Sequence, residues 1–209
     1  MYSCTNSALQ ALQKEYTIKE VKLDKYKTLK IYGIMKFNVK QYEVEDIGNL
    51  SIMHMNMGLM QMATFVLTPK DKNLPLISAD YMYILSNRKC YLEFYDVVKE
   101  KNKQYKSLLK ALSKVINDYK HLEDIETSDA WYADLLTVTS YKGGKPSDDK
   151  DLENLLTKCI STYAKESKDF DKLSKKEKKE KIDITIEYTD GLIKKGGIST
   201  DVFKDQLGE

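Results

Sequence analysis

The fold is decided by the stretch LPLISADYMYIL, residues 74–85. Apolar side chains occupy both sets of alternate positions, so a strand over Leu76–Leu85 buries both of its faces and lies at the centre of a sheet. Segments with helical spacing occur before and after this region, and the helices that they predict can cover the two faces of the sheet. We therefore expect an α/β fold, a three-layer α-β-α sandwich with a central, mainly antiparallel sheet.

Asp80 is the acidic residue inside this buried stretch, on the same face as Ser78 and Met82. An unpaired buried carboxylate is costly, so Asp80 must be partnered, protonated or directed into a cavity. One interpretation is structural, with the carboxylate capping a turn or accepting from a backbone amide. The other is functional: an acid whose pKa a pocket raises can exchange a proton near neutral pH. The periodicity of the stretch does not decide between the two.

The neighbouring segments are rich in β-branched, aromatic and methionine residues, and short turns separate them. Such short connections indicate an antiparallel meander. The second half has apolar residues at helical spacing, apart from one further strand and a charged run at 165–181 that is expected to be a solvated helix or loop. The predicted strands are 30–39, 50–57, 61–67, 76–85, 89–97 and 135–141, and the predicted helices are 6–15, 105–119, 152–163 and 201–207.

Methionines are concentrated between positions 53 and 62. They suit either the wall of a pliable pocket or plain core packing, and the sequence leaves both open. His54 alternates with Met53 and Met55, and we expect its ring to point away from the core towards solvent.

Composition limits the function further. The 209 residues suit one domain, 1–209, and the 34 basic and 32 acidic residues leave a net charge of +2, too small to indicate a nucleic-acid partner. No apolar run is long enough to span a membrane, and the N-terminus lacks the features of a secretory signal. Cys4, Cys90 and Cys159 form neither a disulfide framework nor a zinc motif, and no other metal motif occurs. We expect a cytoplasmic protein without a bound metal.

Two adjacent motifs carry a family resemblance. The segment FVLTP at 65–69, followed by LPLISAD at 74–80, resembles the central part of the ferredoxin-dependent bilin reductases and the related red chlorophyll catabolite reductases. That family has a strand ending in V-x-x-P, a short loop, an L-P-hydrophobic run and then an aspartate. The turn at 57–61 and the strand at 90–96 also fit, and residues 129–131 and 207–209 fit more loosely.

This resemblance implies an α-β-α sandwich that holds a linear tetrapyrrole, such as biliverdin, between the sheet and the C-terminal helices. It also implies that electrons come singly from reduced ferredoxin and that no cofactor is bound. The family's aspartate matches Asp80, which would hydrogen-bond the pyrrole nitrogens or lactam oxygens and relay protons to the bilin. The residues expected to bind the substrate are Ala63, Phe65, Ser78, Met82, Trp131, Lys142 and Asp201.

The sequence departs from the family's pattern at three places. Ala63 stands where some members have a histidine, 17 residues before the aspartate; Asp201 is the acid nearest to the expected second carboxylate; and Lys142 stands in for the arginines that hold bilin propionates. The second proton donor is therefore open between Asp201, Glu93 and ordered water. Three functions follow: a bilin reductase as the leading hypothesis, a non-catalytic tetrapyrrole-binding protein, or a structural or interaction domain with a closed pocket.

Overall fold

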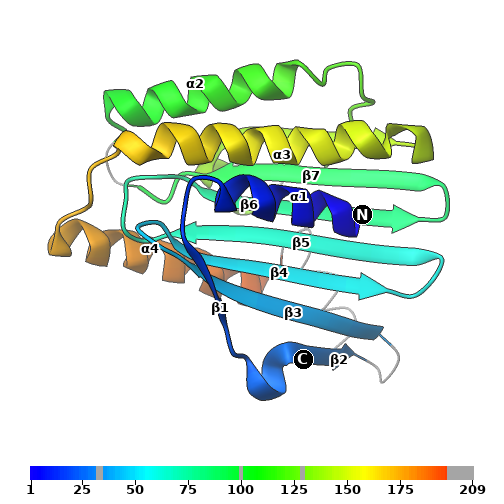
Figure 1. Cartoon of the computed structure of the whole chain (residues 1–209). Coiled ribbons are helices and arrows are strands. Elements are labelled where there is room, and N and C mark those ends of the chain that lie inside the picture. Colours follow the sequence, from blue (N-terminus) through cyan, green and yellow to red (C-terminus); the bar gives the residue numbers. More distant parts are fainter. Residues whose placement is uncertain (32–34, 99–100, 128–129, 197–209) are drawn as a thin grey trace.

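The computed structural model describes residues 1–31, 35–98, 101–127 and 130–196. All eight strands of this part join one antiparallel sheet, in the order β1-β3-β4-β5-β6-β7-β8, and β2 also pairs with β3 (Figure 1). The strands are β1 Ile18–Val21, β2 Thr28–Ile31, β3 Met35–Val44, β4 Gly48–Asn56, β5 Met60–Pro69, β6 Leu76–Ile84, β7 Asn87–Tyr95 and β8 Leu136–Gly144.

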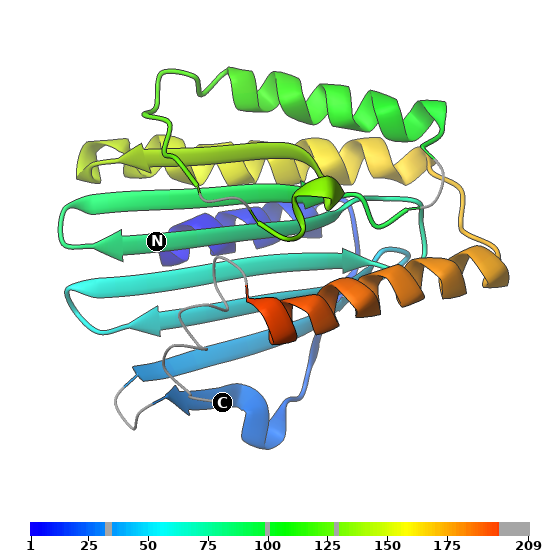
Figure 2. The same cartoon turned by 180° about the vertical axis from the view of Figure 1, so that it is seen from behind.

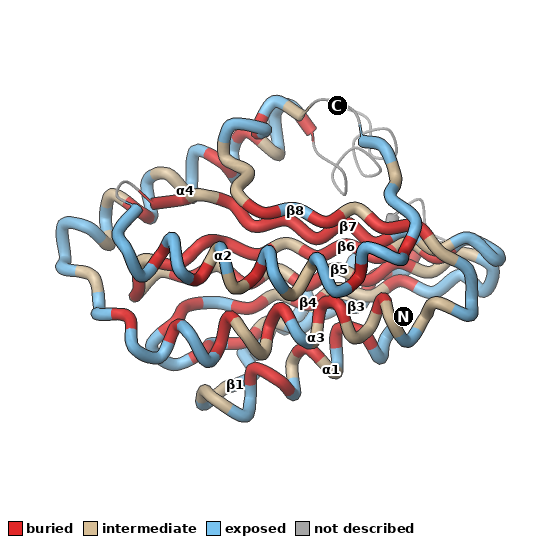
Figure 3. The backbone as a smooth tube through the Cα atoms, turned by 90° about the horizontal axis from the view of Figure 1, so that it is seen from above, coloured by how far each residue is buried: buried red, intermediate tan, exposed pale blue. Residues whose placement is uncertain are grey.

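Helices cover both faces of the sheet. Three of them lie on one face, and α4 lies on the other (Figures 1 and 2). The view from above shows the same three layers, with many buried residues in the sheet, which lies between the two helical layers (Figure 3). The predicted α-β-α sandwich is therefore confirmed. The helices are α1 Tyr2–Gln13, α2 Lys103–Asn117, α3 Asp149–Glu166 and α4 Lys175–Lys195, and short 3-10 turns occur at Asp24–Lys27, Ala133–Leu135, Pro146–Asp148 and Ser167–Asp169.

The main core lies between the sheet and the helices α1, α2 and α3. It includes Tyr81 of β6 and Tyr163 of α3, whose side chains are fully buried. Their hydroxyl groups are not left without partners, because Tyr81 Oη donates to the carbonyl of Leu152 at 3.0 Å and Tyr163 Oη donates to that of Pro75 at 2.9 Å. These bonds tie α3 to the middle of β6 and to Pro75, the residue just before that strand, and they satisfy both buried hydroxyl groups.

Three elements differ from the prediction. The predicted strand 30–39 is two strands, β2 and β3, and the short edge strand β1 has no counterpart because it is largely exposed. The charged run 165–181 is mostly solvent-exposed, as predicted, but its end forms the start of α4, and Lys181 is buried. The predicted helix 201–207 lies outside the described residues. No helix of the described part combines the length and apolar character needed to cross a bilayer.

His54 does not point to solvent, so that prediction is wrong. The ring lies on the α1 side of the sheet, where its Nε2 hydrogen-bonds Thr5 Oγ1 at 2.6 Å and its centroid lies 4.3 Å from that of Tyr2. Burial, aided by the positive charges of Lys40 and the N-terminal amine, lowers the pKa of His54 from 6.5 to about 4. The half-buried ring is therefore neutral in the folded protein at neutral pH.

This neutral histidine makes stability pH-dependent. The folded pKa lies below the unfolded one, so the contribution is complete above pH 6.5 and is lost as the pH falls towards 4. Between about pH 7 and about pH 4, the wild type should lose about 1 to 2 kcal/mol more unfolding free energy than His54→Gln, allowing for partial solvent screening. Urea unfolding at a series of pH values measures this difference. An equal loss in the wild type and in His54→Gln would contradict the assignment.

Candidate functional site

Strand parity places Asp80 on the face of the sheet that α4 covers. Its neighbours Ala79 and Tyr81 join the main core on the α1 side, so alternate residues of β6 point the other way. Leu76, at the start of the same strand, packs in a cluster with Tyr188 of α4. Asp80, Ser78 and Met82 therefore share the α4 face of the sheet.

Hydroxyl groups hold the Asp80 carboxyl group in place. Thr64 lies directly opposite Asp80 in the register of β5 and β6, and its Oγ1 donates to Asp80 Oδ1 at 2.6 Å. Ser78 Oγ lies 3.4 Å from Asp80 Oδ2, a longer and weaker contact. Asp80 is only 6% exposed, so these bonds compensate part of the cost of its burial.

Glu93 is a second buried carboxyl group on this face. It pairs with Ser78 across β6 and β7, whereas Asp80 pairs with Tyr91, so the two acids are diagonal neighbours on adjacent strands. Tyr95 Oη donates to Glu93 Oε2 at 2.5 Å, and Tyr141 Oη donates to Glu93 Oε1 at 2.8 Å. Each carboxylate oxygen thus receives a hydrogen bond from a different tyrosine.

The environment of Glu93 shifts its pKa upwards. Burial raises the pKa of Glu93 above 4.5; the bonds from Tyr95 and Tyr141 oppose this shift, and the charge of Asp80 adds to it. Burial is also the main cause that raises the pKa values of Tyr95 and Tyr141, so both hydroxyls stay protonated and act as donors. The face therefore holds a carboxyl group with a raised pKa next to a second carboxyl group.

Aromatic side chains form one border of this acidic pair. The ring centroids of Tyr95 and Tyr188 are 4.7 Å apart, and those of Tyr95 and Tyr132 are 5.6 Å apart. Trp131 lies against the C-terminal end of α4, where its Nε1 donates to the carbonyl of Gly196 at 2.7 Å. A Cβ at Gly191 would lie 2.1 Å from Trp131 Cη2, so only glycine lets the indole ring contact the helix.

Methionines form the other border. Buried Met35, Met55 and Met62 cluster with Phe37, and Met53, Met60 and Met82 pack against them. These residues lie on β3 to β6, and strand parity places them on the α4 face. The sequence left two interpretations of these methionines open, a pocket wall or core packing. In the structure they form one apolar surface beside Asp80. Its flexible side chains can adapt to the shape of a ligand.

Ala63 and Phe65, which were predicted to bind the substrate, do not lie on the face of the sheet that carries Asp80. Both are buried in the main core on the α1 side, because their parity on β5 is opposite to that of Thr64. The side chain that faces Asp80 across the strand pair is Thr64.

Lys142, which was predicted to bind the substrate, does not lie on the Asp80 face either. It lies on the other face of the sheet, where its Nζ donates to Asp124 Oδ1 at 2.5 Å and lies 3.4 Å from the carbonyl of Leu122. These contacts secure the segment that follows α2. Asp201 lies outside the described residues. Of the remaining predicted residues, Ser78 and Met82 lie beside Asp80, and Trp131 lies at the border of the face.

The described residues contain no group of three or more His, Cys, Asp or Glu side chains placed to hold a metal ion. Cys4, Cys90 and Cys159 are buried free thiols in the main core. The chemistry that this site offers is therefore that of carboxyl and phenol groups, which hydrogen-bond a ligand and exchange protons with it.

A comparison with solved structures adds an independent observation. The chain is similar to phytochromobilin synthase from tomato, whose crystal structure is a complex with biliverdin; the TM-score is 0.80 at 13% sequence identity, over 100% of this chain and 78% of the tomato protein. The two proteins share their fold. A scan against protein-family models gives no match, and neither does a search of curated protein sequences.

The raised pKa of Glu93 can be measured directly. In protein labelled with ¹³C in the side-chain carboxyl of glutamate, Glu93 should titrate above 4.5. Tyr141→Phe removes one bond to the charged form and should raise that pKa further, by about one unit.

Glu93→Gln assigns the signal by deleting it, and Tyr26→Phe, at an exposed tyrosine outside the site, is the matched control. If Glu93 titrates at or below 4.5, or if Tyr141→Phe lowers its pKa, the described shift and its causes are contradicted.

Proposed function

We propose that the protein binds a linear tetrapyrrole of the biliverdin type on the α4 face of the sheet and reduces it with electrons from ferredoxin. The observation that supports this function is the pair of buried carboxyl groups, Asp80 and Glu93, on a fold shared with a protein crystallised with biliverdin. The sequence motifs at 65–69 and 74–80 point to the same family independently of the fold.

Reduction of one double bond of a bilin takes two electrons and two protons. Each electron that enters the conjugated system makes it more basic, so a proton must follow from a group close to the nitrogens or oxygens. Asp80 supplies one proton from the centre of the sheet, and Thr64 fixes the direction of its carboxyl group through the bond to Oδ1. Glu93, whose pKa burial raises, holds the second proton one strand away.

The borders of the face suit a flat, mainly apolar ligand with polar edges. Tyr95, Tyr132 and Tyr188 offer ring surfaces that can contact pyrrole rings, and the methionine cluster offers an adaptable apolar wall. The carboxyl groups lie between these borders, where they can reach the polar inner edge of a curved tetrapyrrole. Exclusion of water by the apolar borders strengthens the hydrogen bonds made there.

The test combines binding with turnover. When the wild-type protein is added to biliverdin, the visible absorption of the pigment should shift and sharpen. Anaerobic addition of reduced ferredoxin should then change the spectrum to that of a reduced bilin. In Asp80→Asn the binding shift should remain, while the rate of reduction falls by about 10²- to 10³-fold, because the amide keeps the shape but cannot transfer the proton.

The control is Asp149→Asn, which removes a carboxylate that pairs with Arg88 at 2.7 Å away from this face; its reduction rate should equal that of the wild type. An unchanged biliverdin spectrum at saturating protein would refute both binding and reduction. Binding without reduction would mean that the protein binds a tetrapyrrole but does not reduce it. Normal turnover in Asp80→Asn would show that Asp80 is not the proton relay.

A further inference from the structure

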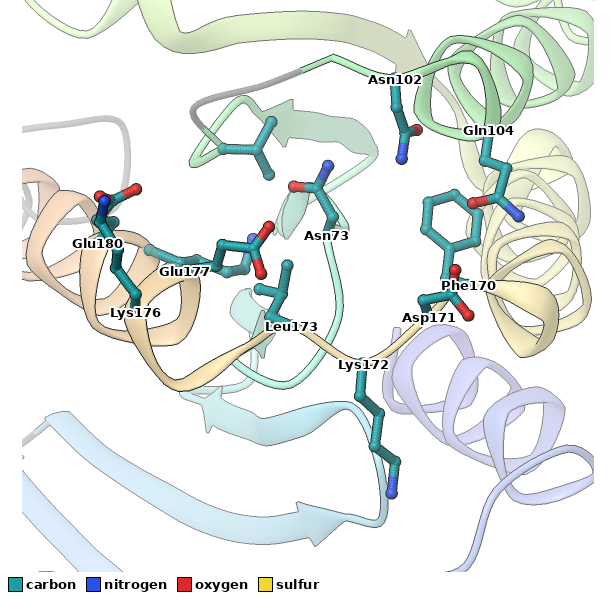
Figure 4. A pocket seen from close by; sticks show the side chains of 12 residues that line it. Asn73, Asn102, Gln104, Phe170, Asp171, Lys172, Leu173, Lys176, Glu177 and Glu180 are labelled. Atoms are coloured by element: carbon teal, nitrogen blue, oxygen red, sulfur yellow. The ribbon is translucent and has the colours of Figure 1, made fainter.

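Two hollows adjoin α2, and their charges differ. The hollow at the N-terminal end of α2 faces the first turns of α4 and carries charges of both signs, among them Lys176, Glu177 and Glu180 (Figure 4). The second, of about 410 Å³, lies between the C-terminal end of α2 and strand β8, and its charged side chains are both lysines. We call it the β8 groove. Its lining residues are Ser113, Ile116, Asn117, Lys120, Thr137, Val138, Thr139 and Lys142.

Strand β8 is the last strand of the sheet, so one of its sides faces away from β7. Near the C-terminal end of β8, the segment that follows α2 covers this side. Ile125 N donates to the carbonyl of Tyr141 at 3.2 Å, and Gly143 N donates to that of Glu123 at 2.8 Å. This pairing ends there, and further along the chain Ala130 packs in the cluster on the α4 face. The segment therefore covers only the last part of the edge.

Thr139 lies on the part of the edge that this segment does not cover. Residues two apart in a strand direct their backbone groups to the same side, and the register between β7 and β8 is regular from Arg88 to Phe94. Since Tyr141 and Gly143 bond away from β7, the N–H and C=O of Thr139 also point away from it. Thr139 is exposed, and among the described residues neither of these two groups has a hydrogen-bond partner. Such an edge can pair with a further strand.

Helix α2 supplies positive charge beside this edge. It contains four lysines and no acidic residue, whereas the chain as a whole is nearly balanced. Lys106 lies seven residues before Ser113 of the groove. Lys110 lies seven residues before Asn117, so both lysines continue the side of α2 that lines the groove. These two and Lys120 are exposed, and within the described part of the chain none of the three forms an ion pair.

We propose that the β8 groove binds an acidic, extended segment of a partner protein, which adds to the sheet as a further strand beside β8. The N–H of Thr139 donates to a carbonyl of the segment, and its C=O accepts from an N–H. Acidic side chains of the segment lie against Lys110 and Lys120. A membrane surface or a nucleic acid would match the lysines alone, because neither presents the alternating N–H and C=O groups that pair with a strand edge.

The experiment uses a blocked peptide of alternating glutamate and valine, EVEVEVE, and the ¹⁵N-labelled 209-residue protein at pH 7 and low salt. Bound peptide should slow hydrogen exchange of the Thr139 amide by about tenfold or more, because this N–H gains an acceptor. Binding should weaken as salt is added, since exposed charges are screened. The basic peptide KVKVKVK should not bind.

Two pairs of variants separate the backbone contact from the charge. Thr139→Pro removes the outward N–H, which an edge strand tolerates, and should weaken binding of EVEVEVE by about 3- to 10-fold. Thr139→Val keeps the N–H and should bind like the wild type. Lys110→Glu should weaken binding by about the same factor as Thr139→Pro, whereas Lys179→Glu, at an exposed lysine of α4, should not.

Failure of EVEVEVE to bind the wild type, or binding that leaves exchange of the Thr139 amide unchanged, would overturn the proposal without any variant. Equally tight binding of an oligothymidylate of the same charge, or of phosphatidylserine vesicles, would show a general attraction for anions and would also overturn it. The measurement uses no bilin and no ferredoxin, so its outcome is independent of the proposed reductase function.

Discussion

Two carboxyl groups, those of Asp80 and Glu93, are buried as diagonal neighbours on adjacent central strands. Two unpartnered carboxylates at such a position would cost several kcal/mol each, so their surroundings must compensate or keep a proton on them. Thr64 donates to Asp80, and two tyrosines donate to Glu93. Replacing this polar group by apolar residues would be the simpler way to build a stable sheet, and the proposed function gives a reason for its presence on the α4 face.

The rest of this face is arranged around the acidic pair. Apolar borders of methionine and tyrosine exclude water from it, and α4 closes the layer through contacts at its two ends. Near the N-terminal end, Lys181 donates to the carbonyl of Leu74, and Lys178 pairs with Asp71 at 2.6 Å. At the C-terminal end, Trp131 packs against Gly191. The same helix thus covers the face on which the bilin site is proposed.

The local pattern of apolar residues predicted the layers of this fold, but it did not predict which residues hydrogen-bond Asp80 and Glu93. Strand β6 was predictable because both of its faces are apolar, and Asp80 stood out for the same reason. Thr64 was missed because pairing register depends on the turn between β5 and β6, and a shift of one residue moves every side chain to the other face. Tyr141 comes from a strand far along the chain and carries no signal that links it to Glu93.

A crystal structure of the protein with biliverdin is the most direct test of whether this face is the catalytic site. We expect the bilin between the sheet and α4, with its pyrrole nitrogens or lactam oxygens within hydrogen-bond distance of Asp80 and its ring system bordered by the tyrosines and methionines. Glu93 should lie on the same side of the bilin as Asp80. A bilin bound on the α1 side, or at a place where neither carboxyl group contacts it, would contradict the proposed site and its proton-transfer chemistry.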